Sequence, residues 1–244
     1  MHKLNDYLVK YENWRKIAFF LAIIGVIQFF VLCVIAMLFY PGGTDLNPDI
    51  KGYSFFMNAY SDLGRIYSPS GKSNTISRLF YTIALITINV LLVPFYLSMN
   101  HFFMEKNPER FLSYLATING IISAFFGLGT AISPVDLFPT IHLFFALAFG
   151  LFSSLTLGLY TVPILINQSY PNRYGYVIIS YAVLLMVYML LVFIDPAPTS
   201  ELGLVIVITG QKIVLFSGFF CIFVLAFASI KSYNIILEAN RKIA

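Results

Sequence analysis

Six long apolar runs take up most of the 244 residues and leave few folds open to this chain. The runs cover residues 17–40, 76–99, 111–133, 141–166, 174–194 and 203–230. Each reaches the ~20 residues that an α-helix needs to cross the ~30 Å hydrocarbon core of a bilayer. In lipid, a helix satisfies its own backbone hydrogen bonds, which an irregular segment cannot do. The sequence therefore predicts an all-α polytopic membrane protein, a six-transmembrane-helix bundle over residues 17–230.

The composition excludes a soluble globular domain. Only 11% of the residues are charged and 59% are hydrophobic, whereas soluble domains carry about a quarter charged residues. Ten basic residues fall in the termini and in the second and fourth connections, against four in or beside the first connection. The positive-inside rule then predicts that both termini are cytoplasmic. The basic pI reflects this orientation, so we expect no nucleic-acid partner, and a plasma (cell) membrane is the expected location.

Three segments outside the apolar runs have their own character. Residues 1–16 alternate apolar and charged residues at helical spacing and end near Trp14, which predicts a cytoplasmic interfacial amphipathic helix. The long first connection, residues 41–75, is rich in aromatic residues and is expected to be a structured outer loop with a short helix around residues 55–63. Residues 231–244 are expected to extend the last span as a cytoplasmic tail.

A lysine stands inside the last apolar run, beside a glutamine. Lys212 lies about nine residues, or ~13 Å, from the outer start of that run. A charge at such depth costs a few kcal/mol and is usually paired or used. Three roles remain open for Lys212: a salt bridge with an outer acid, a counter-ion for an anionic headgroup or substrate, and a catalytic or proton-carrying amine. Gln211 is expected to share its site.

A second polar group bridges the third and fourth runs. Asp136 follows Ser133-Pro134-Val135, and His142 follows Phe138-Pro139. An Asp–His pair across this turn would suit a general base, a metal ligand set or a helix cap. The other histidines, His2 and His101, are expected on the cytoplasmic side, and zinc normally takes three or more protein ligands. We therefore expect no metal and no cofactor.

In the fourth run, His142 is followed at every fourth position by a small residue: Ala146, Gly150, Ser154 and Gly158. Such spacing places them on one helix face and lets two helices approach closely in lipid. The third run carries a matching set that includes Gly120, Ala124 and Gly127. The pattern predicts that these two spans pack tightly and that His142 faces protein.

The first connection also carries the motif Ser61-Asp62-Leu63-Gly64, followed by Arg65. Together with segments 41–43, 55–60, 70–74 and 127–142, this motif resembles a large archaeal and bacterial membrane family whose domain has no assigned activity. The resemblance covers about residues 17–230. That family is in turn distantly similar to six-span proteins related to the damage-regulated autophagy modulators, some of which act in lipid remodelling or as adaptors. The resemblance implies a topology and motif positions, and no reaction.

The sequence favours a protein that binds a membrane lipid or a small anionic ligand in a polar pocket near the outer leaflet. The expected lining is Asp62, Arg65, Asp136, His142, Gln211 and Lys212. One alternative is an intramembrane lipid hydrolase or transferase that uses Asp136 and His142 as its acid–base pair. Another is an ion-coupled carrier that uses Lys212 and an acid. The expected partners are membrane lipids, and a protein partner is not identified.

Overall fold

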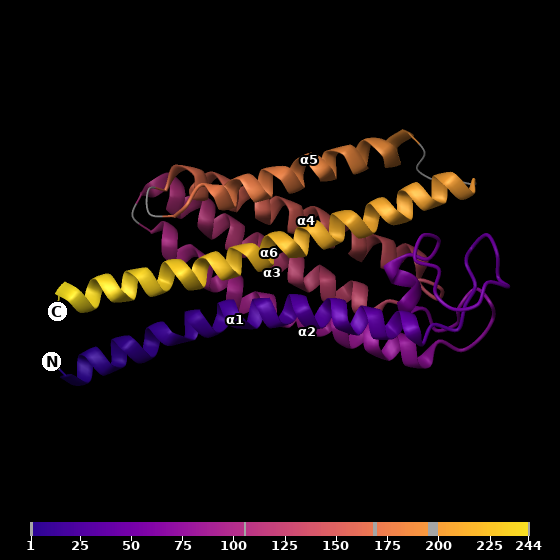
Figure 1. The fold of residues 1–244 in the computed structure, drawn as a ribbon, viewed down its shortest axis with the longest axis horizontal. Helices are drawn as coiled ribbons and strands as arrows, with labels where there is room; N and C mark the ends of the chain where they lie inside the picture. Colours follow the sequence, from indigo (N-terminus) through magenta and orange to yellow (C-terminus); the bar gives the residue numbers. More distant parts are fainter. Residues whose placement is uncertain (1, 105, 168–169, 195–199, 244) are drawn as a thin grey trace.

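The computed structural model describes the backbone of residues 2–104, 106–167, 170–194 and 200–243, and the side chains of 14–104, 106–167, 170–194 and 200–233. Within these ranges the chain is all-α, with six long helices that lie side by side (Figure 1). The long helices are α1 (His2–Leu38), α2 (Thr75–Met99), α3 (Asn107–Ile132), α4 (Pro139–Ile166), α5 (Arg173–Ile194) and α6 (Glu201–Ile243). Two short 3-10 helices are η1 (Tyr60–Gly64) and η2 (Asn100–Phe103).

Each long helix contains a stretch that is long and apolar enough to cross a membrane. Their outward faces are apolar as well: Ile24 on α1, Leu151 on α4 and Met186 on α5 are each more than half exposed. Water would not favour such surfaces over the length of a helix, whereas lipid tails do. The predicted six-helix transmembrane bundle is therefore confirmed.

The two termini lie at one end of the bundle, and the connection between α1 and α2 lies at the other (Figure 1). Helix α1 runs without a break from His2, so the segment predicted as an interfacial helix is continuous with the first span. The side chains of residues 2–13 are outside the described part of the chain. Helix α6 likewise continues past the membrane-spanning stretch as far as Ile243, and the side chains beyond Tyr233 are not described.

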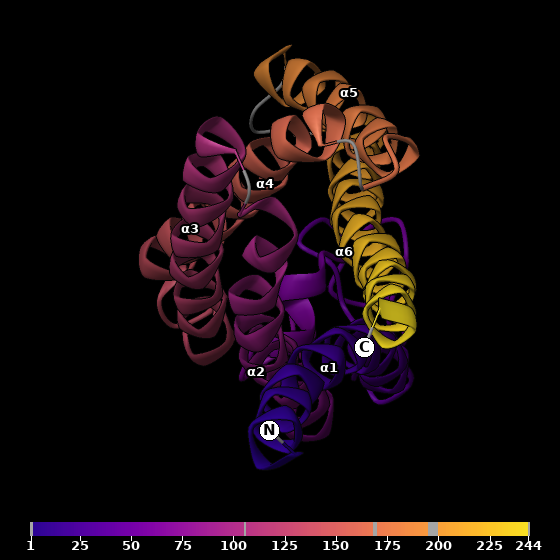
Figure 2. The ribbon, with the colours of Figure 1, turned by 90° about the vertical axis from the view of Figure 1, so that its left-hand side faces the viewer.

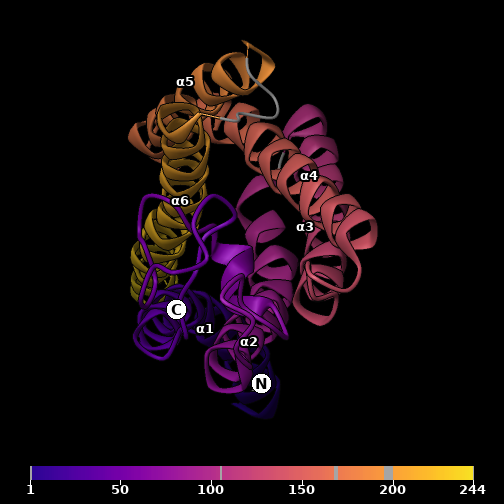
Figure 3. The ribbon, with the colours of Figure 1, turned by 90° about the vertical axis from the view of Figure 1, so that its right-hand side faces the viewer.

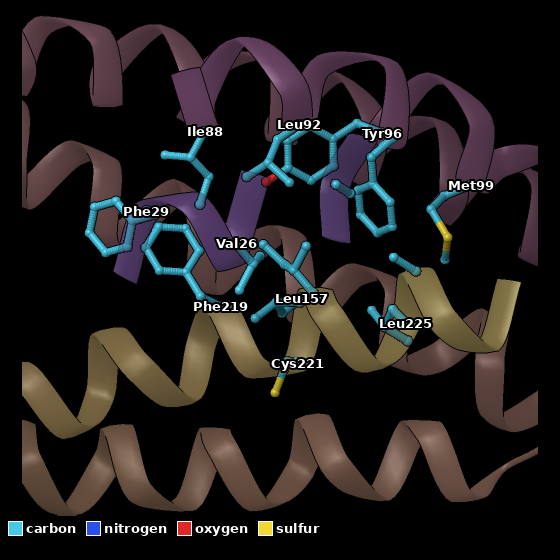
Figure 4. Packing of buried hydrophobic residues seen from close by; sticks show 14 of the residues in the cluster. Val26, Phe29, Ile88, Leu92, Tyr96, Met99, Leu157, Phe219, Cys221 and Leu225 are labelled. Atoms are coloured by element: carbon cyan, nitrogen blue, oxygen red, sulfur yellow. The ribbon is translucent and has the colours of Figure 1, made fainter. Parts of the chain in front are cut away.

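A core of large apolar side chains joins the helices. Phe29 of α1 packs on Phe219 of α6 with ring centroids 4.8 Å apart, and Ile88, Leu92 and Leu157 fill the space around them (Figure 4). Seen from the end that carries the termini, α1 and α6 lie on one side of the bundle and α3 and α4 on another (Figure 2). This packing fixes the end of α6 that carries Lys212 against α1.

Helices α3 and α4 pack tightly, as the sequence predicts, but through a different face of α4. A Cβ at Gly129 of α3 would lie 2.2 Å from the ring of Phe145, so the ring sits directly on the α3 backbone. By contrast, a Cβ at Gly150 or Gly158 of α4 would meet nothing within 4 Å. The prediction that the small-residue face of α4 forms this contact is thus wrong. On α3 only Gly129 of its three glycines meets α4, whereas a Cβ at Gly120 or Gly127 would meet Tyr96 or Asn89 of α2, so those two glycines do not form the predicted contact.

Candidate functional site

Residues 41–74, which we call the cap, fold over one end of the bundle (Figure 3). Two isolated backbone bridges, Gly42 to Lys51 and Tyr67 to Ser73, close its two loops. Gly43 has a φ of +87°, and a Cβ there would lie 2.4 Å from the backbone nitrogen of Ser70. Only glycine fits both conditions. The cap is therefore folded upon itself, and its short helix is the 3-10 helix η1 rather than one over residues 55–63.

Asp62 and Arg65 form the centre of the cap. Arg65 Nε donates to Asp62 Oδ1 at 2.7 Å, and its Nη2 donates to Asp45 Oδ1 at 3.0 Å. The other oxygen of Asp62 accepts from the backbone nitrogen of Ala59 at 2.9 Å and from Asn58 Nδ2 at 3.1 Å. Burial alone would lower the pKa of Arg65, but the carboxylates of Asp62 and Asp45 raise it. The guanidinium is thus charged and already bound on two sides.

Lys212 of α6 is 3% exposed and reaches the cap through backbone carbonyls. Its Nζ donates to the carbonyl oxygen of Phe55 at 2.5 Å and to that of Asn58. Among the described residues, no carboxylate lies within salt-bridge distance of this ammonium. Of the three roles left open for Lys212, the salt bridge with an outer acid is therefore not formed among these residues. Hydrogen bonds that involve a charged group contribute about 1.5–3 kcal/mol each, which helps to offset the burial of the ammonium.

The position of Lys212 along the bundle explains why this charge is tolerated. Phe216, one turn later on α6, packs on Phe30 of α1 with ring centroids 5.2 Å apart. Because α1 and α6 run antiparallel (Figure 1), Lys212 lies at about the level of Val34, roughly one turn before α1 ends at Leu38. The ammonium therefore sits near the end of α1, under the cap, while α6 itself continues from Lys212 back to Glu201.

Aromatic residues of the cap surround the same ammonium. The ring centroids of Phe55, Tyr53 and Tyr60 lie 4.9, 5.3 and 5.8 Å from Lys212 Nζ. The Tyr53 hydroxyl donates to the carbonyls of Asn58, at 2.8 Å, and Ala59, at 3.0 Å. Burial raises the pKa of the Tyr60 phenol to about 12, and burial also raises that of Tyr53. Both phenols therefore stay neutral beside the lysine near neutral pH.

Asp136, in the turn between α3 and α4, also binds the cap. Its carboxylate accepts the backbone N–H groups of Ile66, at 3.0 Å to each oxygen, and of Tyr67 at 2.9 Å. Asn74, the last residue of the cap, adds bonds within the cap. Its Nδ2 donates to the carbonyls of Leu63 at 3.0 Å and Arg65 at 3.1 Å. A half-buried carboxylate and a buried amide thus replace regular secondary structure in holding the cap together.

His142 faces protein, as predicted, but it does not pair with Asp136. The imidazole is 6% exposed, and its Nδ1 lies 2.6 Å from the carbonyl oxygen of Ser133. A carbonyl only accepts, so Nδ1 carries the proton and Nε2 is the acceptor in the neutral ring. Within the described residues, Asp136 and His142 share no hydrogen bond. The acid–base pair of the hydrolase or transferase hypothesis is therefore not assembled here.

Gln211 lies outside this group of residues. Its side chain is exposed, whereas its neighbour Lys212 is buried, since successive residues of a helix point about 100° apart. No hydrogen bond joins Gln211 to the cap in the described part of the structure. The prediction that Gln211 lines a common site with Lys212 is thus wrong. Nor do the described side chains include any group of three or more His, Cys, Asp or Glu residues that could hold a metal ion.

A groove of about 520 Å³ runs between α4 and α5. It is lined by Ser154, Gly158, Thr161, Val162, Ile178, Ile179, Tyr181, Ala182, Leu185, Met186 and Met189. Its α5 lining extends from Ile178 to Met189, a rise of ~16 Å along the helix. Tyr181 lies beside Ser154 near the middle of α4. From there the α4 lining runs to Val162, toward the end away from the cap, and the α5 lining runs to Met189, toward the cap end.

The groove is apolar, and its polar side chains are already used. Ser154 Oγ and the Tyr181 hydroxyl lie 2.9 Å apart across it. Ser154 also donates to the carbonyl of Gly150 at 2.8 Å, and Thr161 donates to that of Leu157 at 2.9 Å. The volume is within the range of about 300–1,000 Å³ that is usual for small-molecule sites. Such a surface suits an apolar chain better than a charged group.

A buried carboxylate at the far end of the bundle was not anticipated from the sequence. Glu109, in the first turn of α3, is fully buried and accepts from Asn167 Nδ2 at 2.6 Å. Its other oxygen lies 3.9 Å from Lys106 Nζ. Charges in a short connection normally indicate solvent, so the sequence gives no signal for this burial. Glu109 joins the start of α3 to the end of α4.

The structure therefore places Lys212 of α6 and Asp136 of the α3–α4 turn against the cap, which contains Asp62 and Arg65. His142 bonds to Ser133 and makes no hydrogen bond to the cap in the described structure. No protein-family model, no curated protein and no solved structure matches this chain. The groove between α4 and α5 was not predicted. The glycine and serine spacing of α4 is its only signal in the sequence, and such spacing equally indicates helix packing.

Proposed function

We propose that this protein is an integral membrane lipid-binding protein and that an acyl chain of a bilayer lipid occupies the groove between α4 and α5. The observation that carries the proposal is the groove itself, an apolar hollow of about 520 Å³ between two helices that are long and apolar enough to span a membrane. Its flanking side chains Val162, Met186 and Met189 are 45–57% exposed on the surface that faces lipid. An acyl chain can therefore enter sideways from the bilayer.

This proposal keeps the lipid of the sequence-based hypothesis and changes its position. An anionic headgroup bound near the cap would need a free cation. Arg65 is engaged by Asp62 and Asp45, and Lys212 by two carbonyls. Binding in the groove needs no cation, because the groove contacts the acyl chain of the lipid, and the lipid headgroup stays at the membrane surface. The binding energy then comes from apolar contact.

The carrier hypothesis has less support than lipid binding. It requires that Lys212 exchange a proton or an ion with an acid, and the nearest partners of its ammonium are carbonyl oxygens. The enzyme hypothesis lacks the contact between Asp136 and His142 on which it depended. We further propose, from the charge asymmetry of the sequence, that both termini are cytoplasmic and that the protein resides in the plasma membrane. We retain the resemblance to the six-span family as a proposal.

Native mass spectrometry of protein released in dodecyl maltoside tests the lipid proposal. The informative variant is Gly158→Leu, because a Cβ at Gly158 meets nothing within 4 Å and the position lines the groove. A leucine there projects into the groove without displacing a neighbour. We expect one retained lipid on the wild-type chain and at least a tenfold lower occupancy on the variant, the equivalent of ~1.4 kcal/mol.

Gly150→Leu is the matched control. Gly150 lies two turns earlier on the same helix, also has open space around it, and is not part of the groove lining. Both variants replace a helical glycine, which should raise helix propensity by up to about 1 kcal/mol. Equal lipid occupancy in the wild type and both variants, or none in any of them, would refute the proposal.

A further inference from the structure

The surroundings of Lys212 have the composition of a recognition site for an ammonium ion. Two backbone carbonyls accept from its Nζ, and three aromatic rings lie within 6 Å of it. Aromatic faces attract cations through their quadrupole, and protein sites for ammonium ligands use the same arrangement. All of these groups belong to cap residues 53–60, while the ammonium belongs to α6.

The site is built independently of the lysine. The Tyr53 hydroxyl donates to the carbonyls of Asn58 and Ala59, which turns this stretch of backbone around the ring. Asn58 is fully buried and is held by Asp62 Oδ2 and the carbonyl of Gly43. The carboxylate of Asp62 therefore stabilises the position of the carbonyl without contacting the ammonium.

We propose that cap residues 53–60 form a binding site for a primary ammonium group and that Lys212 is its resident ligand. Attachment of the cap to α6 then depends on occupancy of this site. One wall of the site is the ring of Phe55, which is 48% exposed and lies 5.4 Å, centroid to centroid, from the ring of Phe56. A small ammonium ion can reach the site from that side once the lysine is removed.

Lys212→Ala with chemical rescue tests this site. The variant lacks three methylene groups and the ammonium, which together correspond to n-propylammonium. Hydrogen exchange of the peptide that contains residues 53–60 is measured in dodecyl maltoside, which carries no ammonium group. We expect exchange to rise by about tenfold or more in the variant, since the charged hydrogen bonds are lost. Added n-propylammonium should restore protection.

Three controls make the result specific. n-Propanol has the chain without the charge and should not restore protection. Tetramethylammonium has the charge without N–H donors, so full rescue by it would show that the rings suffice and would overturn the assignment of the carbonyls. Gln211→Ala removes the exposed neighbour of Lys212 and should leave exchange unchanged.

A second variant covers the case in which Lys212→Ala does not fold. Tyr60→Leu keeps the lysine and removes one ring of the site, whose hydroxyl makes no hydrogen bond in the described structure. The proposal expects faster exchange at residues 53–60 in this variant. Unchanged exchange in Tyr60→Leu, wild-type exchange in Lys212→Ala, or equal rescue by n-propanol would each overturn it.

Discussion

Single polar side chains join parts of this protein that are far apart in sequence. Asp136 satisfies two consecutive backbone N–H groups, those of Ile66 and Tyr67, which lie about 70 residues earlier. A carboxylate that accepts backbone N–H groups is a strong, charge-assisted partner. Because no strand or helix provides these bonds, the cap depends on such side chains more than a regular element would.

Replacing Asp136 should therefore loosen the cap. We expect Asp136→Ala to lower the free energy of unfolding by about 2–3 kcal/mol, because both N–H groups lose their partner. Thermal melting in detergent and hydrogen exchange at residues 66–67 measure the effect. Asp49→Ala is the control, since Asp49 is an exposed acid of the same cap. Equal melting temperatures for the two variants would mean that Asp136 does not anchor the cap.

The sequence predicts some of these residues and misses their partners. Lys212 stands out as a charge in an apolar run, and its burial could be predicted. Its partners could not, because they are backbone carbonyls, and every residue carries one. Which carbonyl approaches Lys212 depends on the path of the cap, which the side-chain pattern does not encode. For the same reason Asp136 was expected to pair with His142 and instead binds backbone.

At the scale of elements, the sequence predicts which helices are neighbours, but it does not predict which faces of those helices pack together. Short connections predict that α3 and α4 are antiparallel neighbours, and the structure confirms their tight packing. The choice of face is decided by the ring of Phe145, which fits over Gly129 of α3. Small residues on α4 therefore remain at the surface. Spacing alone cannot distinguish a packed small-residue face from one that borders a groove.

Two glycine substitutions distinguish a glycine that packs against a neighbouring helix from one that lies at the surface. Gly129→Ala should destabilise the protein by about 1–3 kcal/mol, because the new methyl group overlaps the Phe145 ring and forces α3 and α4 apart. Gly150→Ala should be neutral or should stabilise by about 0.5–1 kcal/mol, since its surroundings are open and alanine favours a helix. Melting temperatures in the same detergent compare the two. A milder effect at Gly129 than at Gly150 would contradict the packing described above.

For the whole molecule, the orientation in the membrane is a prediction from charge that cysteine labelling can check. The two native cysteines, Cys33 and Cys221, are buried and free, so they should give little background. Lys72→Cys places a thiol on the exposed cap, and Lys106→Cys places one at the opposite end. With a membrane-impermeant maleimide on intact cells, only the cap thiol should react. If only Lys106→Cys were labelled, the protein would have the opposite orientation in the membrane.

The attachments of the cap also imply an order of assembly during synthesis. The cap leaves the membrane once α1 and α2 are inserted, but its partner Asp136 is made later, and Lys212 lies 157 residues after Phe55. The carbonyls of the cap must therefore stay hydrated until the last helix enters the bilayer. The cap therefore closes only when all six helices are in place, and a truncated chain would leave it open to proteases.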